Sequence, residues 1–229
     1  MPASSNQKGA SSSPSASQES VHDEAERELR EETHQRMVGV VPAFTTVYNG
    51  HAAPLDAREK FRLWVADTAD PFDFAAAGVD AAVEQHSHEF PEYGYGFSGY
   101  SKRYGASFVD DADGTFFAEA VLPSLLHQDP RYFRLGTGSI AHRLGYTLLS
   151  AVRCRGDNFH WQPNVSLLGG NLIGGAISNG YYPAANRGFG LTMERGFTVT
   201  GEDLLSSLAT EFYPDISKAL FHRKKKTQP

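Results

Sequence analysis

The stretch Val165-Ser-Leu-Leu-Gly-Gly-Asn-Leu-Ile-Gly-Gly-Ala-Ile-Ser178 decides how the rest of this chain can pack. Gly170, Gly174 and Ser178 recur at every fourth position, so on an α-helix they form one smooth strip. A strip without bulky side chains lets another helix backbone approach closely. The stretch therefore predicts a helix that packs tightly within a helical protein, and it carries no catalytic motif.

A second run of small residues offers a partner for this strip. Residues 70–87 begin with Asp70, a helix-capping residue, followed by a proline at the first helical position. Gly78 and Ala82 then lie four residues apart on one face. We expect the helices over 70–87 and 164–180 to pack closely, either with one another or between two copies of the chain in a homo-oligomer.

Most of the remaining chain also shows helix-starting residues followed by apolar residues at helical spacing. A capping-box pattern begins at Asp56, Ser139 precedes an apolar stripe, and Thr200 starts another helix. A stripe of aromatic residues predicts a helix that ends or kinks near Pro123. Three separate helices are expected in the last fifth of the chain, where Pro214 interrupts the pattern. We therefore expect an all-α fold, an irregular multi-helix bundle with close packing of glycine- and alanine-lined helices.

Composition divides the chain into four parts. Residues 1–20 are mostly Ser, Ala, Pro, Gln and Gly, which cannot bury enough apolar surface to fold, so we expect them to be disordered. Residues 21–53 are expected to form a charged helix and an extended linker, and residues 54–222 to form the helical domain. Residues 223–229 form a basic tail.

Charge and cysteine content exclude several classes of protein. The net charge is −6 and the pI is near 5.8, whereas nucleic-acid binding needs clustered Lys and Arg, so no nucleic-acid partner is expected. A single cysteine, Cys154, excludes an internal disulfide framework and a cysteine-based zinc site. The first residues contain no apolar run, so no secretory signal is expected.

Three runs of sequence resemble an uncharacterised family of bacterial proteins. They are Leu122-Pro-Ser-Leu-Leu-His-Gln-Asp-Pro-Arg-Tyr-Phe133, Tyr100-Ser-Lys-Arg-Tyr-Gly105 and Gly174-Gly-Ala-Ile-Ser-Asn179. The run that ends at Phe133 is long and specific. The resemblance implies a location in the cell envelope or at the membrane periphery, and it supplies no activity or catalytic residue. Members of that family often begin with an apolar leader, whereas this chain begins with a serine-rich stretch.

The sharpest candidate for chemistry combines two carboxylates and two histidines. Glu119 lies in an otherwise apolar run, where a carboxylate either pairs with a cation or has a raised pKa. His127 and Asp129 follow at the end of the same helix, and His142 lies in the first turn of the next. Together they can bind a metal or run acid–base chemistry. In the alternative, structural interpretation His127 and Asp129 cap helices and Arg131 neutralises Glu119.

Two further sets of residues are candidates. Three carboxylates share one helical face and precede a His-x-His sequence, which suits a divalent cation, although the wet face of an amphipathic helix explains them too. These are Asp73, Asp80 and Glu84. The aromatic stripe either lines an apolar ligand cavity or fills a core. It consists of Phe97, Tyr100, Tyr104 and Phe108.

Gly136-Thr-Gly138 precedes a helix, which is an anion-binding geometry, but it lacks the strand and lysine of a phosphate loop. The sequence identifies no cofactor.

Three functions remain open. The favoured one is a non-enzymatic, membrane- or envelope-associated protein of structural or interaction type, whose basic tail attracts an anionic membrane surface. The basic residues of the tail are Arg223, Lys224, Lys225 and Lys226. The second is an enzyme or metal-binding protein that uses the set around Glu119. The third is a small apolar ligand or lipid binder.

Overall fold

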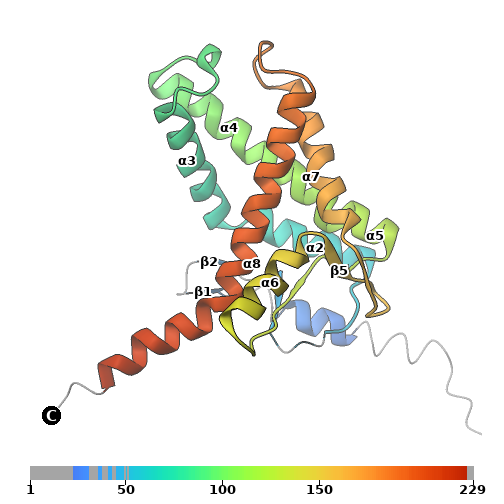
Figure 1. Cartoon of the computed structure of the whole chain (residues 1–229). Helices are drawn as coiled ribbons and strands as arrows, with labels where there is room; N and C mark the ends of the chain where they lie inside the picture. Colours follow the sequence, from blue (N-terminus) through green and yellow to red (C-terminus); the bar gives the residue numbers. More distant parts are fainter. Residues whose placement is uncertain are drawn as a thin grey trace, which may run out of the picture.

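The computed structural model describes residues 23–30, 36–37, 41–42, 45–48, 50 and 52–225. The segment predicted to be disordered and the side chains of the basic tail lie outside the described residues. Within the described part the fold is all-α, as the sequence predicts: helices dominate, and each strand is only two or three residues long (Figure 1).

The first described helix packs against α2 (Ala57–Thr68). α2 begins at the predicted capping box, in which the Asp56 carboxylate accepts from the Glu59 N–H and the Glu59 carboxylate accepts from the Asp56 N–H. Leu63 of α2 is fully buried in a small apolar cluster with two residues of the 23–30 helix. The charged helix predicted in this region therefore buries one of its sides. The buried residues from it are Ala25 and Leu29.

Short strands follow, where an extended linker is expected. β1 (Arg36–Met37) pairs antiparallel with β2 (Val41–Pro42). β3 (Thr46–Val47) pairs in parallel with β4 (Tyr132–Phe133), which lies far along the chain. This pairing holds the linker against the helical domain, and Val47 and Phe133 are both buried there.

α3 (Pro71–His86) and α4 (Gly96–Thr115) pack side by side and are joined through a short helical turn, η1 (Pro91–Tyr93). Gly78 of α3 lies against tyrosine rings rather than against another backbone, and the Tyr100 hydroxyl donates to its carbonyl oxygen at 3.0 Å. The predicted close backbone approach is therefore wrong at Gly78, where tyrosine rings of α4 take the place of another backbone. Ala82 lines an open groove between α3 and α4.

α4 runs directly into a π-helical segment, η2 (Phe116–Val121), and then α5 (Leu122–Leu126). The prediction that the helix ends or kinks near Pro123 is confirmed: a π-helical turn lies just before this proline, and α5 ends three residues after it, at Leu126, with His127 in the left-handed region. The segment between α4 and α5 is important for the site described below, because it carries Glu119.

α6 (Ile140–Ser150) begins at the predicted cap, where the Ser139 hydroxyl accepts from the His142 N–H at 3.2 Å. A hairpin follows that the sequence did not indicate, formed by β5 (Arg153–Arg155) and β6 (Trp161–Pro163). α6 packs on the lower part of α8 and lies at the outside of the molecule (Figure 1).

α7 (Val165–Ile177) is the central helix, and its glycine strip lies against α4 and η2 of the same chain. A Cβ added at Gly170 would lie 2.3 Å from the Ala118 nitrogen, and one at Gly174 would lie 2.7 Å from Gly114 Cα. The prediction that residues 70–87 pack on this strip is wrong, because α3 packs on α4 instead. The strip packs on the α4–η2 helix, where Gly114 and Ala118 leave the backbone open to close contact.

The opposite side of α7 packs against α8 (Phe189–Lys225), which follows the short turn η3 (Ser178–Gly180). A Cβ on Gly175 would lie 2.4 Å from the Thr192 oxygen, so this contact is also backbone to backbone. α7 is thus held between two long helices.

α8 is one helix of 37 residues, whereas three helices were expected. Pro214 lies inside it, and the helix changes direction in its last part (Figure 1). Just before this proline, buried Glu211 accepts a hydrogen bond from Arg143 of α6 at 2.6 Å. We infer that this ion pair fixes the chain where the proline weakens the helix.

Apolar and charged residues are distributed unusually in this bundle. Many large apolar side chains are exposed on the helices, while charged side chains such as Lys60, Arg103 and Glu211 are fully buried. Exposed apolar surface of this extent is uncommon on monomeric water-soluble proteins. Among the described helices, none combines the length and the apolar composition that crossing a bilayer requires.

Candidate ligand-binding cavity

A cavity of about 700 Å³ lies between α3, η2 and α8 and extends to the β5–β6 hairpin. Its walls include alanine and leucine side chains together with an unusual number of acidic ones. We call seven of the acidic residues the carboxylate cluster. They are Asp67, Asp73, Asp80, Asp111, Glu119, Glu202 and Asp203.

The members of the carboxylate cluster come from five helical elements. α2 supplies Asp67, α3 supplies Asp73 and Asp80, α4 supplies Asp111, η2 supplies Glu119, and α8 supplies Glu202 and Asp203. Each carboxylate projects from a helix, so the helix fixes the position of its backbone. The cluster forms only because these helices meet around one cavity.

Burial and mutual repulsion raise the pKa values of these groups. Burial, followed by the neighbouring carboxylates, raises the pKa of Asp73 to about 7 and that of Asp111 to about 6. The same two causes raise the pKa of Glu202 to about 8, although Arg195 partly opposes them. The pKa of Asp203 rises to about 7 through burial, against a hydrogen bond from Asn171. The cavity therefore contains carboxyl groups that change charge near neutral pH.

Glu119 is the most deeply placed member of the cluster. It lies on the π-helical segment η2, directly beside the residue that contacts Gly170, and it is 9% exposed. Its Oε2 atom is buried and has no hydrogen-bond partner. Burial and then the charges of Asp67 and Asp203 raise its pKa well above the ordinary value. A buried, unpartnered acceptor facing a cavity is costly for the fold unless something else donates to it.

Asp203 is positioned by a buried amide of the central helix. Asn171 Nδ2 donates to Asp203 Oδ2 at 2.8 Å and to Thr200 Oγ1 at 3.0 Å. Asn171 is itself fully buried on α7. The cluster is therefore tied to the glycine-lined helix through one side chain.

The cation nearest to the cluster is Arg195, and it is engaged elsewhere. Its guanidinium lies 2.9 Å from Glu84 and 3.8 Å from Asp110, and it also packs over the rings of Phe90 and Tyr182. Asp110 additionally accepts a hydrogen bond from the Tyr182 hydroxyl at 2.6 Å. This network lies beside the cavity, so Arg195 offsets the charge of the cluster only in part. Three further arginines line the cavity from the segments around β4 and β5: Arg131, which pairs with Asp129, and Arg153 and Arg155.

The three carboxylates predicted to bind a divalent cation do not share one site, because Arg195 pairs with one of them. Asp73 and Asp80 line the cavity, whereas Glu84 pairs with Arg195. Within the part of the chain that the structure describes, no group of three His, Cys, Asp or Glu side chains is arranged to hold a metal ion. The interpretation of these residues as a metal site is wrong, because the helix that carries them faces a wide cavity and an arginine.

The predicted set of two carboxylates and two histidines does not converge. The His127 side chain is 84% exposed, with Nδ1 3.8 Å from Asp157 Oδ2, and His142 is exposed on α6. Asp129 lines the cavity but forms a buried 2.8 Å ion pair with Arg131. Arg131 therefore neutralises Asp129, and the expectation that it neutralises Glu119 is wrong. The turn after α5 directs His127 outward, so only Glu119 remains available in the cavity.

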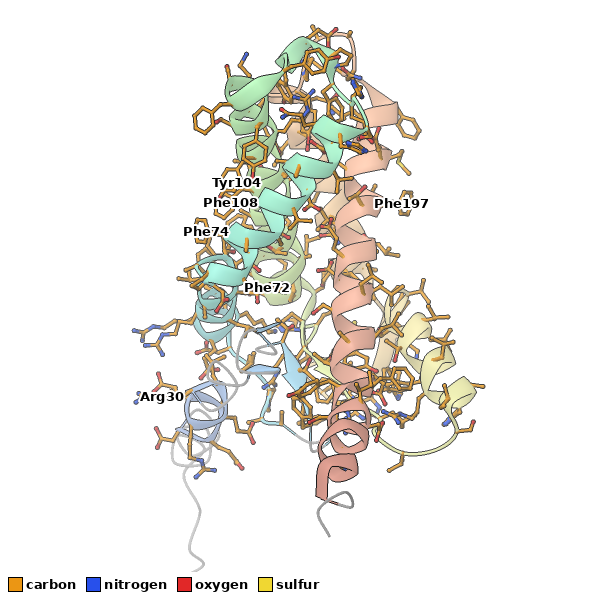
Figure 2. All side chains as sticks on the ribbon, turned by 90° about the vertical axis from the view of Figure 1, so that its left-hand side faces the viewer. Arg30, Phe72, Phe74, Tyr104, Phe108 and Phe197 are labelled. Carbon is orange, nitrogen blue, oxygen red and sulfur yellow. The ribbon has the colours of Figure 1, made fainter. Side chains whose placement is uncertain are left out.

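The aromatic stripe does not line the cavity. Tyr100, Tyr104 and Phe108 pack along the seam between α4 and α3, where Phe108 stacks on Phe74 with ring centroids 4.8 Å apart. Figure 2 shows Phe74, Tyr104 and Phe108 on the side of α3 that faces away from α8. Tyr100 and Tyr104 instead line a second, open apolar groove of about 750 Å³ against α3, so the expectation of a ligand-lining wall stays a prediction for these two residues. Phe108 is not part of that lining, and Phe97 is 85% exposed.

Other aromatic side chains do reach the cavity. Phe72 of α3 lies in the region between α3 and α8 in Figure 2, and the β5–β6 end contributes further rings. The aromatic residues of the lining are Phe72, Tyr132, Phe133, Tyr146 and Trp161. No sequence pattern pointed to these residues as cavity lining, because they come together only through contacts between distant parts of the chain.

The predicted anion-binding turn before α6 holds an anion from the chain itself. The N–H groups of Leu135 and Gly136 donate to the Glu211 carboxylate at 3.0 and 2.9 Å. Arg143 Nε and the Tyr132 hydroxyl donate to the same carboxylate. These hydrogen bonds outweigh the effect of burial and lower the pKa of Glu211. The turn is therefore structural and is not open to a phosphate.

Comparisons with protein-family models, curated proteins and solved structures give no significant match to this chain. The resemblance to a bacterial family therefore stays a prediction. The fold and the site together define an all-α protein with an acidic internal cavity, and the geometry of that cavity is the basis for the proposal that follows.

Proposed function

We propose that this protein binds a small organic cation with apolar methylene segments, in the class of aliphatic diamines and polyamines, within the cavity between α3 and α8. The observation that carries the proposal is the buried, unpartnered Oε2 of Glu119 facing a cavity lined by further carboxylates. An ammonium group supplies the hydrogen-bond donor that Oε2 lacks, together with a positive charge beside the carboxylates. The arginines of the lining, Arg131, Arg153 and Arg155, come from the segments around β4 and β5.

The charge of the cavity favours a ligand with more than one positive centre. Carboxylates from α3, α4 and α8 surround the same space, and the charges acting on Asp73, Asp111 and Glu119 are all negative. Buried charges are normally paired, because leaving one unpaired costs on the order of several kcal/mol. A single metal ion does not meet this need, since no described residues form a coordination group.

The apolar part of the lining favours an organic ligand over an inorganic one. Ala76, Val79 and Leu204 lie among the acidic residues in the wall. An aliphatic polyamine alternates ammonium groups with methylene runs, so it can contact both kinds of surface. The cavity volume, about 700 Å³, lies within the range of roughly 300–1,000 Å³ that is usual for small-molecule sites.

Binding rather than catalysis is proposed because the cavity offers no activated nucleophile. Cys154 lines it, but burial raises the pKa of this thiol to about 12, so the thiol remains neutral. The two histidines of the predicted catalytic set lie outside the lining. This proposal keeps the non-enzymatic and small-ligand parts of the sequence-based hypotheses.

Isothermal titration of spermidine into the full chain at pH 8 tests the proposal. We expect saturable binding, a roughly tenfold or greater loss of affinity for Glu119→Gln because a charge-assisted hydrogen bond is removed, and no change for the exposed Glu92→Gln control. Absence of saturable binding, or equal affinity for Glu119→Gln and the control variant, would contradict the proposal.

A further inference from the structure

The outer face of α6 is apolar and has no partner among the described residues. Its large side chains recur at four-residue spacing and remain exposed: Ile140 by 74%, Leu144 by 40% and Leu148 by 47%. Val152, one turn beyond, is 52% exposed. The sequence predicts this stripe as one face of a helix, and the structure leaves that face exposed.

The orientation of α6 is fixed, so the stripe cannot turn inward. Arg143 is buried by its contacts with Glu211 and Asp215 of α8. Thr147, one turn further along, is fully buried and shares a hydrogen bond with the Tyr132 hydroxyl. These polar anchors occupy a different side of the helix, and rotating the stripe into the bundle would break both.

The hairpin that adjoins α6 extends this surface with aromatic and basic side chains. Trp161 is 43% exposed and Phe159 is 49% exposed. The exposed Arg153 guanidinium lies 4.1 Å from the centroid of the Trp161 ring. The hairpin and the helix are joined by Asn164, whose side chain donates to the Ser150 carbonyl at 2.9 Å. Trp, Arg and apolar side chains in one place are typical of surfaces that sit at a membrane interface.

The local charge is opposite to that of the whole protein. Residues 130–156 contain five arginines and no Asp or Glu, whereas the chain carries a net charge of −6. Three of them are turned to partners in the protein: Arg131 pairs with Asp129, Arg143 pairs with Glu211 and Asp215, and Arg134 lies 4.0 Å from Asp215. The outward basic charge beside α6 is that of exposed Arg153, with Arg155 partly exposed on the same strand, and this charge is complementary to an anionic lipid surface.

The size of the surface favours a membrane over a second copy of the chain. α6 has 11 residues, so it is roughly 16 Å long, and one face of it presents only roughly 200 Å². A stable protein–protein interface buries about 800 Å² on each partner. A lipid surface requires no matching partner shape, so a short amphipathic helix is sufficient for it.

We propose that the outer face of α6, together with Trp161 and Arg153, docks on an anionic lipid surface. In this arrangement Ile140, Leu144 and Leu148 enter the headgroup boundary, and the Arg153 side chain remains at the level of the lipid phosphates. The proposal does not rest on ligand binding, although Trp161 and Arg153 also line the cavity on its β5–β6 side. It differs from attraction through residues 223–226, because it depends on α6 itself.

Flotation of the full-length protein with vesicles tests this docking surface. The vesicles contain phosphatidylcholine with roughly 30% phosphatidylglycerol, or phosphatidylcholine alone, near physiological salt. We expect the wild type to bind the anionic vesicles more strongly. The double variant Leu144→Glu/Leu148→Glu should bind at least tenfold more weakly, and Arg153→Gln roughly fivefold more weakly. Phe97→Glu, at a still more exposed apolar residue on α4, should bind like the wild type.

Two further measurements separate this surface from its rivals. A variant with neutral residues at 223–226 should retain most of the binding, and thermal melts should show that the double variant is folded. The proposal is overturned if neutralising 223–226 abolishes binding while the double variant binds normally. It is also overturned if the wild type forms a dimer that the double variant loses and neither protein binds vesicles.

Discussion

Replacing Gly170 by alanine is the sharpest probe of how the bundle is packed. A Cβ at this position would lie 2.3 Å from the Ala118 nitrogen and 2.5 Å from Ala118 Cα. Both atoms belong to the backbone of η2, so no side chain can rotate away and the two helices must separate. Overpacking of this kind costs about 3 kcal/mol at the upper end of its usual range. The higher helix propensity of alanine returns about 1 kcal/mol, which leaves a net loss of about 2 kcal/mol.

A matched control is available in the same bundle. A Cβ at Gly201 of α8 would meet nothing within 4 Å, so Gly201→Ala should stabilise the protein by about 0.4–1 kcal/mol. For a chain of this size, the melting temperature should fall by roughly 4–8 °C for Gly170→Ala and rise by roughly 1–4 °C for Gly201→Ala. The assay is thermal unfolding followed by circular dichroism. Shifts of the same sign and size in the two variants would refute the reasoning.

The remaining predictions concern charge. Burial raises the folded-state pKa values of Asp73 and Asp203 to about 7, far above those of an unfolded chain. The stability that their protonated forms contribute is therefore lost as pH rises from about 4 to 7. The melting temperature should be lower at pH 8 than at pH 5.5, and equal values would contradict this. Glu119→Gln replaces a buried carboxyl group whose ionisation is opposed by burial and by neighbouring carboxylates, so calorimetry should show a melting temperature that depends less on pH, with the larger gain at pH 8. Glu211→Gln leaves buried Arg143 with only the half-exposed Asp215 as an anion, so urea unfolding should show a loss of about 3 kcal/mol, and a loss below about 1 kcal/mol would argue against this network.

Features set by neighbouring residues were predictable from the sequence. The helix starts at Asp56, Asp70, Ser139 and Asn164 all show the expected side-chain cap, because a cap depends only on a few adjacent positions. The small residues at 170 and 174 do face a close backbone contact. Local chemistry alone was sufficient for these features.

Features set by distant contacts were not predictable in the same way. Pro214 was expected to end a helix, but the buried Glu211 anchor and the packing of α8 on α7 hold the helix through it. Apolar spacing on α6 indicates one face of a helix, but in the fold this face is exposed and the arginine on the same helix is buried. Periodicity shows that a helix has an apolar face, and it does not show what covers that face.

The candidate site was only partly visible before the fold was known. Glu119 was singled out because a carboxylate in an apolar run is unusual, and it is the deepest member of the cluster. Asp67, Glu202 and Asp203 gave no signal, since each looks like an ordinary polar position on its own helix. Their shared role depends on the meeting of α2, η2 and α8, which sequence spacing does not encode.

The most direct test of the central claim is the number of protons released when spermidine binds. Titration calorimetry at pH 7 in buffers of different ionisation enthalpy gives this number. Because Asp73, Asp203 and Glu202 have pKa values near or above 7 in the empty cavity, a bound cation should lower them and release protons. We predict net release in the wild type and a smaller release for Glu119→Gln. Binding without proton release, or with proton uptake, would contradict the assignment of the carboxylate cluster as the cation site.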